Sequence, residues 1–400
     1  MKTAVWLYLF LFVAFFDLHA QYPILTPFAV SLGAAPSFIG LMMGLYSITH
    51  LPGNLIAGYG VDRFGSRLFI VFSLLTAGGI LLLQSLVASP WELLVLRSIS
   101  GFVLAFLSPA CSALLARIAR DAVHQGKLMA GNGLVHTLAS VVSPAAGALL
   151  VARIGFELSF LLLGWILIGT ALCALVFLRE APAGHDEPAE GAAVVKSGTA
   201  GTASEAGQDA AAGTDAGGGA SLPWLVYVLP VAMACAQGIL SFELPLMSTT
   251  KEGILTTGLL FSVVSIGALL TLSMLFLHRF SAFLRTLWGA LFLACAYFAI
   301  AAGTPLPLAV LLLFLGMAKG IIFPALSSLL IELSGGRRYG RTFSILSIAF
   351  SVGAFIGPLL AGQLRSYVSP YFIAFLALMA AVCVLPFHQG RQSAPRTRLT

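Results

Sequence analysis

Apolar stretches long enough to cross a lipid bilayer follow one another along nearly the whole chain. A membrane-spanning helix needs about 20 mostly apolar residues, and 59% of the 400 residues are hydrophobic while only 9% are charged. A water-soluble domain carries about 25% charged residues and could not bury so much apolar surface. The sequence therefore predicts an all-α membrane protein.

Twelve transmembrane helices are expected, each followed by a short polar turn or by glycine and proline. They are placed at about 4–31, 37–59, 68–88, 91–118, 127–151, 156–178, 223–248, 254–277, 286–303, 306–333, 340–364 and 370–387. The first apolar run resembles a signal peptide. It is interpreted as a helix, because Asp17 and His19 fit a cleavage site poorly and the run resumes at Tyr22.

The composition changes abruptly after the sixth expected helix. Residues 180–221 are rich in Ala, Gly, Ser, Asp and Glu and contain no bulky apolar run, which is typical of a flexible linker. The expected organisation is a six-helix bundle, a cytoplasmic linker, a second six-helix bundle and a cytoplasmic tail, at residues 1–178, 179–222, 223–388 and 389–400.

Basic residues divide unevenly between the two expected sides of the membrane. With the N-terminus on the cytoplasmic side, 16 of the 21 Lys and Arg residues fall in cytoplasmic segments and three, Arg153, Lys251 and Arg365, fall outside. Arg97 and Lys319 lie within helices. Cytoplasmic loops carry an excess of Lys and Arg, so both termini are predicted to be cytoplasmic. The net charge of +6 is attributed to this topology, and nucleic acid is not expected as a partner.

The two halves of the chain repeat one another. Pro109–Leu115 reads like Pro324–Leu330, an offset of 215 residues, and Ala20-Gln21 reads like Ala236-Gln237, an offset of 216. Further short matches follow at offsets of 216 and 218. Six helices per half preserve orientation, so the repeat is parallel, an arrangement found in transporters whose halves are related by an axis along the membrane normal.

The most specific motif lies after the second expected helix, where the sequence reads GYGVDRFGSR. It resembles the loop motif G-x-x-x-D-R-x-G-x-R of the major facilitator superfamily, and the matching residues are Gly58, Asp62, Arg63, Gly65 and Arg67. Gly65 permits the positive φ of a tight turn. The resemblance implies a cytoplasmic gate that latches the two halves, with Asp121 as a partner for Arg67.

The fourth expected helix carries a second match. Arg97, Gly101 and Ala105 fit the family motif R-x-x-Q-G-x-x-x-A, with Ser100 in place of the usual Gln. An arginine within the membrane is costly unless it meets water or a partner. The resemblance therefore implies a functional role for Arg97.

Glycine and proline motifs in the fifth and eleventh expected helices resemble the antiporter motif of the family. The residues are Pro144, Gly147, Gly353, Gly357 and Pro358. Small residues at this spacing let helices approach closely, so they are predicted to form a helix-packing motif. General helix packing explains the same pattern, so these residues give little support to antiport.

In this family the first, fourth, seventh and tenth helices line a central cavity, and all four carry polar residues here. These residues form the predicted proton-coupling and substrate path: Asp17, Gln21, Arg97, Gln237, Ser241, Glu243 and Lys319. A rise of 1.5 Å per residue places Asp17 and Arg97 at a similar depth, so the two could meet. Asp17 is the predicted proton site, tuned by Arg97.

No P-loop, zinc-ligand spacing or nucleophile elbow is present in the sequence, so an enzyme is not expected. The resemblance favours a proton-coupled antiporter of the bacterial drug-efflux branch that exports small organic molecules. Alternatives are a symporter or uniporter for a metabolite, possibly anionic, with Lys319 and Arg97 as counter-charges, a lipid flippase, and a membrane receptor or scaffold.

The remaining expectations concern the setting of the protein. A small-molecule substrate and membrane lipid are the predicted partners of a monomer in the inner (plasma) membrane. No metal or organic cofactor is expected, and a proton gradient is predicted to supply the energy.

Overall fold

The computed structural model describes residues 2–119, 121–178, 224–247, 250–274, 279–333 and 339–385. These residues form helices joined by short turns, and no strand occurs among them. The first helices are α1 (Lys2–Ala20), α2 (Tyr22–Ser31), α3 (Pro36–Phe64), α4 (Ser66–Gln84), α5 (Pro90–Leu104), α6 (Leu107–Arg117) and α7 (Ala122–Phe177). They are followed by the 3-10 helix η1 (Trp224–Tyr227), α8 (Val228–Leu246), α9 (Lys251–Leu272), α10 (Ala282–Ala301), α11 (Leu308–Leu333), α12 (Tyr339–Leu364) and α13 (Pro370–Val384).

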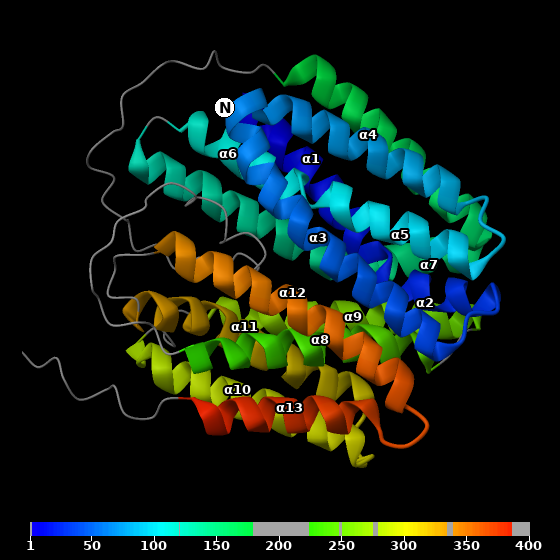
Figure 1. Ribbon diagram of the computed structural model, residues 1–400, viewed down its shortest axis with the longest axis vertical. Coiled ribbons are helices and arrows are strands. Elements are labelled where there is room, and N and C mark those ends of the chain that lie inside the picture. Colours follow the sequence, from blue (N-terminus) through cyan, green and yellow to red (C-terminus); the bar gives the residue numbers. More distant parts are fainter. Residues whose placement is uncertain are drawn as a thin grey trace, which may run out of the picture.

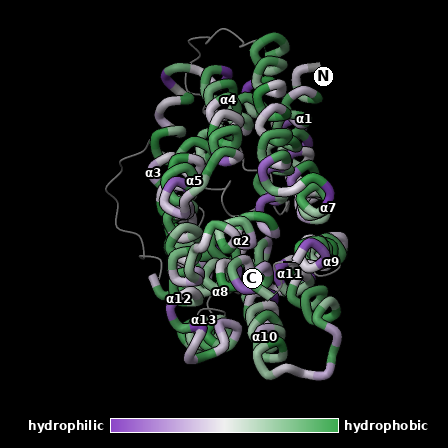
Figure 2. The backbone as a smooth tube through the Cα atoms, turned by 90° about the vertical axis from the view of Figure 1, so that its right-hand side faces the viewer, coloured by the Kyte–Doolittle hydropathy of each residue, from purple (hydrophilic) through white to green (hydrophobic). Residues whose placement is uncertain are grey.

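Nine helical stretches within the described ranges are long and apolar enough to cross a membrane, and α13 is a shorter apolar helix. Hydrophobic residues follow most of the helical path in Figure 2, with hydrophilic residues in short stretches. Large apolar side chains such as Leu83, Trp165 and Trp288 are exposed, as expected for surfaces that face lipid rather than water. The prediction of an all-α membrane protein is confirmed.

Two expected helices are interrupted by proline. The first is divided at Gln21 into α1 and α2, and Pro23 lies at the start of α2. The fourth is divided into α5 and α6 around Ala105 and Phe106, four and three residues before Pro109. Proline lacks a backbone N–H and its ring clashes with the carbonyl four residues earlier. The break around Ala105 therefore lies at the carbonyl that has no hydrogen bond from Pro109, whereas the break at Gln21 lies two residues after the corresponding carbonyl of His19.

The expected fifth and sixth helices form one continuous element, α7, with a break at Gly155. Gly155 has a φ of 85°, a left-handed conformation that glycine adopts without steric cost. The chain bends there, and the segments on either side correspond to the two helices predicted at 127–151 and 156–178.

The helices are arranged in two groups with long axes running in roughly the same direction (Figure 1). The first group holds α1 to α7, and the second holds α8 to α13. The groups contact each other mainly through α3 with α12, α7 with α9, and α2 with α8. The start of α1 and the end of α13 lie at the same end of the helices, on the left in Figure 1.

The glycine and proline motifs lie at close helix contacts. A Cβ added at Gly357 would collide with the backbone of Cys235 on α8, and one at Gly353 would collide with Val231. Gly147 is packed in the same way on Ala20 at the end of α1. Only glycine permits these approaches, because its lack of a Cβ lets two backbones meet.

Contacts between the two groups lie at the end away from the described termini. Pro358 of α12 contacts Gly40 near the start of α3, and Gly362 packs on Pro36. On the other side of the molecule, Pro144 of α7 packs on Gly258 of α9. The two groups are therefore held together at the end where α2 leads into α3 and α12 leads into α13.

Candidate functional site

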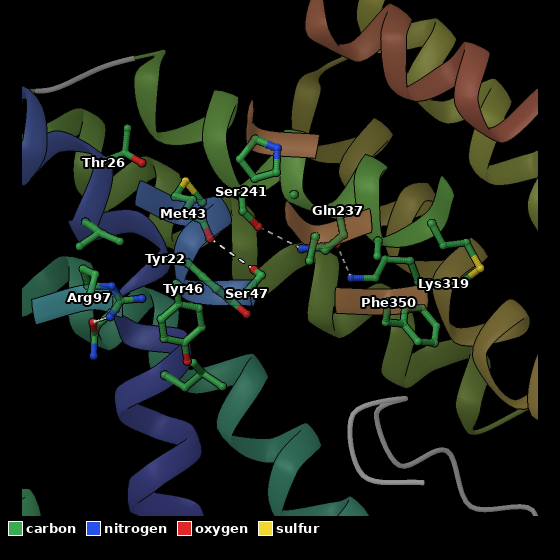
Figure 3. A pocket seen from close by; sticks show the side chains of 18 of the residues that line it. Tyr22, Thr26, Met43, Tyr46, Ser47, Arg97, Gln237, Ser241, Lys319 and Phe350 are labelled. Carbon is green, nitrogen blue, oxygen red and sulfur yellow. Dashed lines mark hydrogen bonds between the residues drawn. The ribbon is translucent and has the colours of Figure 1, made fainter. Parts of the chain in front are cut away.

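A central cavity of about 290 Å³ lies between the two groups of helices (Figure 3). Its walls come from α1, α2, α3 and α5 on one side and from α8, α10, α11 and α12 on the other. Most of the lining is apolar or aromatic, with Met43, Leu293 and Phe350 as examples. A concave, mostly apolar site with a few convergent polar groups is typical of small-molecule binding.

Three polar side chains of the first group form a hydrogen-bonded chain. The Gln21 amide nitrogen donates to Asp17 Oδ2 at 2.9 Å, and the Gln21 amide oxygen accepts from Arg97 Nη1. Asp17 and Arg97 are only 2% and 6% exposed. No ion pair joins them directly within the described part of the chain. An amide has a donor and an acceptor, so Gln21 can serve the acid with one end and the cation with the other.

The hydrogen-bonded chain of Asp17, Gln21 and Arg97 has atoms that could form further hydrogen bonds. Asp17 Oδ1 and Arg97 Nε are buried without a hydrogen-bond partner among the described residues. Gln21 and Arg97 line the central cavity, whereas Asp17 is not among the lining residues. The carboxylate is thus separated from the cavity by the amide and the guanidinium, and its free oxygen can accept a proton.

Tyr46 of α3 is a site residue that the sequence interpretation missed. The guanidinium carbon of Arg97 lies 4.4 Å from the centre of the Tyr46 ring. A cation over an aromatic face is attracted by the negative charge of that face, so Tyr46 gives the buried Arg97 a second partner. The available signal was an aromatic residue with a hydroxyl within an apolar helix, but that helix was not among those expected to line the cavity.

The second group of helices contributes a related cluster. Lys319 Nζ of α11 donates to the Gln237 amide oxygen at 2.6 Å, and the Gln237 amide nitrogen donates to Ser241 Oγ at 3.2 Å. All three line the central cavity. Figure 3 shows Lys319 and Arg97 on opposite sides of it. The structure therefore brings together six of the seven residues predicted for the path, three from each group.

The seventh residue, Glu243, lies apart from the cavity lining. Its carboxylate forms an ion pair with Arg365 Nε at 3.2 Å, and Arg365 follows the last residue of α12. Glu243 is buried. The pair connects α8 to the end of α12 near the closed end of the molecule, so Glu243 contributes to packing there and not to the polar lining of the cavity.

The residues of the predicted cytoplasmic gate lie around the junction of α3 and α4. Gly65 has a φ of 88° and separates these two helices. Arg63 donates to the Tyr59 hydroxyl at 3.4 Å, and Arg67 donates to the Leu175 carbonyl near the end of α7. The surroundings of Gly58 and the side chain of Asp62 lie outside the described part of the structure. Asp121 caps α7 by accepting from the His124 backbone nitrogen at 2.6 Å.

Histidine rings form a further feature that was not predicted. The rings of His19 and His136 are 5.1 Å apart in an edge-to-face arrangement. His19 Nδ1 lies 2.7 Å from the Phe15 carbonyl, which can only accept, so this nitrogen carries the hydrogen. Both rings line a second cavity of about 250 Å³ that also contains Lys319 and Gln237.

Membrane-spanning helices around a central cavity with buried ionisable residues define a transport protein. A sequence profile of the Major Facilitator Superfamily matches residues 7–307 and 282–398 of the chain. The matches cover most of the chain, and the protein belongs to the Major Facilitator Superfamily. Its members are membrane transporters and not enzymes, as the sequence predicts.

Curated relatives include multidrug resistance proteins. The chain is 24% identical over 379 residues to Multidrug resistance protein MdtG of Escherichia coli (strain 55989 / EAEC), covering 90% of this chain and 86% of that protein. It is 26% identical over 170 residues to Multidrug resistance protein 1 of Bacillus subtilis (strain 168), covering 42% of this chain. The chain spans 43% of the length of the Bacillus protein. These relatives confirm the resemblance to the drug-efflux branch.

A solved structure has the same fold. A bacterial homolog to the human lysosomal transporter Spinster, in an inward-facing and occupied conformation, aligns with a TM-score of 0.71 and 17% sequence identity. The alignment covers 96% of this chain and 93% of that chain. At this identity the likeness concerns the fold alone.

Proposed function

We propose that the protein is a proton-coupled secondary transporter that exports small organic molecules across the membrane by alternating access. The observation that carries this proposal is the buried chain of Asp17, Gln21 and Arg97 in the wall of the central cavity. Ionisable residues inside a membrane protein are costly and mark substrate and proton paths. The multidrug relatives support export as the direction.

Twelve membrane crossings are part of the proposal. The nine candidate stretches count α7 once, although Gly155 divides it, and they do not include α3 or α13. Counting α7 twice and adding α3 and α13 gives twelve. An even number of crossings fits the position of the start of α1 and the end of α13 at one end of the molecule (Figure 1). The positive-inside rule favours the cytoplasm for that end.

The rest of the setting follows from this topology. Residues 1–178 and 223–388 would form two six-helix bundles joined by a cytoplasmic linker at 179–222. The protein would act as a monomer in the plasma membrane, which is the inner membrane if the cell has two. A tag inserted in the 179–222 segment should be reached by labelling reagents only from the cytoplasmic side, and labelling from outside would contradict the topology.

The contacts between the two groups support an alternating-access cycle. They lie at the end opposite the described termini, where Pro358 contacts Gly40 and Pro144 contacts Gly258. With cytoplasmic termini, this end faces outward, and the cavity is closed to the outside. Opening it requires these contacts to separate and the cytoplasmic ends to meet. We propose that the gate residues at the α3–α4 junction, Asp62 and Arg63 among them, latch the cytoplasmic ends in that second state.

In the proposed coupling, Asp17 carries the proton and Gln21 links it to the cavity. An ionised Asp17 attracts the Gln21 amide and, through it, Arg97. Protonation removes the charge that holds this arrangement. Arg97 and Gln21 then become free to rearrange, and since both line the cavity, the proton and the substrate can influence one another without sharing a contact.

Purified protein in lipid vesicles tests the proposal. A pH gradient imposed on wild-type vesicles should drive accumulation of a transported dansyl-labelled compound. Asp17→Asn should fold and lose at least about tenfold of the gradient-driven accumulation. The exposed Glu252 at the start of α9 supplies the control, since Glu252→Gln should keep it. Full gradient-driven accumulation in Asp17→Asn would rule out Asp17 as the proton carrier.

A second candidate function is the uptake of an anionic metabolite together with protons. The observation in its favour is that two cations, Arg97 and Lys319, line the cavity whereas Asp17 does not. Under this alternative an imposed gradient drives the substrate in the same direction as the proton. The direction of dye movement in the vesicle assay therefore separates the two candidates.

A further inference from the structure

Lys319 has no acidic partner among the residues that the structure describes. Its ammonium group donates to the Gln237 amide oxygen at 2.6 Å, and within the described residues no carboxylate lies within ion-pair distance of it. An ammonium group has three N–H donors, so two remain available. Lys319 is half-buried and lines the central cavity, where these donors can reach a bound molecule.

The charges around the cavity do not balance. Asp17 and Arg97 are opposite charges joined through Gln21, so the first group of helices is compensated. Glu243 is paired with Arg365 away from the cavity. Lys319 is left as one uncompensated positive charge. A charge in a membrane interior is costly unless it has water or a partner, and a substrate with a negative charge would supply that partner.

Arg97 is less available to a ligand than Lys319. One of its nitrogens is bonded to Gln21, and its guanidinium carbon lies over the Tyr46 ring. It is also more deeply buried than Lys319. Lys319 can therefore bind a ligand with the loss of fewer existing contacts than Arg97.

Lys319 stands where two cavities meet. It lines both the central cavity of about 290 Å³ and the second cavity of about 250 Å³, as do Tyr22, Gln237 and Phe323. Tyr22 carries a hydroxyl, which makes it a further hydrogen-bond donor among the residues that line both cavities. The hydroxyls of Thr137, Ser140 and Ser265 in the second cavity already donate to carbonyls of their own helices.

The central cavity is otherwise suited to an apolar body. Its lining includes Leu18, Leu25, Met43, Met233, Leu293 and Phe350. Removal of apolar surface from water drives binding to such a lining, and methionine side chains adapt to ligands of different shape. A ligand that uses both the lining and Lys319 must be apolar at one end and negatively charged at the other.

We propose that the substrate is an amphipathic organic anion, whose anionic group binds Lys319 at the junction of the two cavities and whose apolar body occupies the central cavity. This rests on the proposed transport function, because it assigns the substrate class of the same site. The Tyr22 hydroxyl is the second group that donates to the anion. Cationic compounds with the same body are repelled by Lys319 and Arg97.

Equilibrium binding to the full-length purified protein tests the proposal with three matched fluorescent probes. They are dansyl-6-aminohexanoate, its methyl ester, and the amine of the same length, dansyl-1,6-diaminohexane. The carboxylate should bind wild-type protein at least tenfold more tightly than the ester, and the amine should bind least. Lys319→Gln should weaken carboxylate binding to the level of the ester and leave ester binding unchanged.

Three further variants make the test specific. Lys319→Arg should retain the preference for the carboxylate, because the positive charge is kept. Tyr22→Phe should weaken carboxylate binding several-fold without changing ester binding. Lys251→Gln is the matched control, since Lys251 is an exposed lysine at the start of α9, and it should behave like the wild type.

Several outcomes would overturn the proposal. These are equal binding of the three probes, failure of all three to bind, or unchanged carboxylate binding in folded Lys319→Gln. Vesicle transport separates this inference from the function it rests on. A carboxylate preference in binding without any accumulation would reject the transport function alone. Gradient-driven accumulation of the amine but not the carboxylate would reject the anionic substrate and leave the transport function standing.

Discussion

The two groups of helices place a glutamine at the same position of the repeat but surround it differently. Gln21 and Gln237 each accept a hydrogen bond from a cation, Arg97 in the first group and Lys319 in the second. The amide nitrogen of Gln21 donates to an acid four residues earlier, whereas that of Gln237 donates to a serine four residues later. The same amide therefore completes a neutral cluster in one half and a positive cluster in the other.

This difference suggests that the two halves have different roles. The cluster of Asp17, Gln21 and Arg97 is closed on itself, with its acid set back from the cavity. The cluster of Lys319, Gln237 and Ser241 lies wholly on the cavity wall. We therefore propose the first cluster as the proton site and the second as the site of the substrate charge. The halves of a repeated fold can thus diverge in charge while they keep the same contact between an amide and a cation.

Removing the cation from each cluster should give the largest difference. Arg97→Met leaves the buried Asp17 without its compensating charge, and loss of one partner of a buried pair costs about 3–5 kcal/mol. Lys319→Met removes a charge that has no acidic partner, so folding should be unchanged or improved. Thermal unfolding and the yield of monodisperse protein measure both effects.

The double variant Asp17→Asn with Arg97→Met is the control for this prediction. It removes the stranded charge and should recover more than half of the lost stability. Equal destabilisation by Arg97→Met and Lys319→Met would contradict the assignment of a compensated cluster to one half only.

The glutamines themselves should also differ in importance. Gln21→Met removes the hydrogen bonds of both Asp17 and Arg97. An unsatisfied buried polar group costs about 1–3 kcal/mol of stability, and a charged group costs more. The expected loss is therefore about 3 kcal/mol. Gln237→Met strands only Lys319, which can bond to water in the cavity, so the loss should stay below about 1 kcal/mol. Unfolding measurements on the two variants would show this difference in stability. Similar losses of stability would mean that the two amides have the same structural role.

A smaller effect is expected at Tyr46, which stabilises the cation of the first half alone. Tyr46→Leu removes the aromatic face beneath Arg97 and should cost about 1.5 kcal/mol, in the range for a desolvated cation–π contact. Tyr46→Phe keeps the face and should match the wild type in the same unfolding assay. A loss in Tyr46→Phe equal to that in Tyr46→Leu would show that the hydroxyl and not the ring supports Arg97.

The sequence predicts the members of these clusters but not their connections. Asp17, Arg97 and Lys319 are conspicuous because charges are rare in apolar helices, and helical rise alone placed Asp17 and Arg97 at one depth. That Gln21 lies between them depends on the break before Pro23, which places Gln21 between α1 and α2, and on side-chain rotamers. Tyr46 could not be assigned because an aromatic residue in an apolar helix is common and its contact with Arg97 on α5 is set by packing.

The fold was more predictable than the site. The helices can be located to within a few residues from the length of the apolar stretches, the distribution of Lys and Arg between loops, and the internal repeat. These signals reflect the membrane environment and chain symmetry and do not require knowledge of side-chain packing. The break before Pro109 had a readable signal, because the fourth residue before a proline loses its hydrogen bond, but other prolines, such as Pro52 and Pro324, lie inside unbroken helices. The contacts between small residues of different helices, such as Gly258 with Pro144, depend on the arrangement of the two groups. No local sequence pattern predicts them.

The smallest effect is the influence of the proton on anion binding, and its sign separates the two proposed couplings. Exchange requires that proton and substrate exclude each other, whereas cotransport requires that they favour each other. Under cotransport, the second candidate function, protonation of Asp17 removes a negative charge and releases Arg97 from Gln21, and both changes strengthen the binding of an anion at Lys319. A coupling of about 1 kcal/mol, or roughly fivefold in Kd, is the size expected for charges separated by intervening side chains. Cotransport therefore predicts that the Kd of dansyl-6-aminohexanoate falls as the pH is lowered from 8 to 5.5 in wild-type protein and that Asp17→Asn binds tightly at both pH values, whereas the proposed exchange predicts that the Kd rises. A fall in Kd would favour movement of the anion together with the proton. Weaker binding at acidic pH in the wild type, absent from Asp17→Asn, would favour export in exchange for protons.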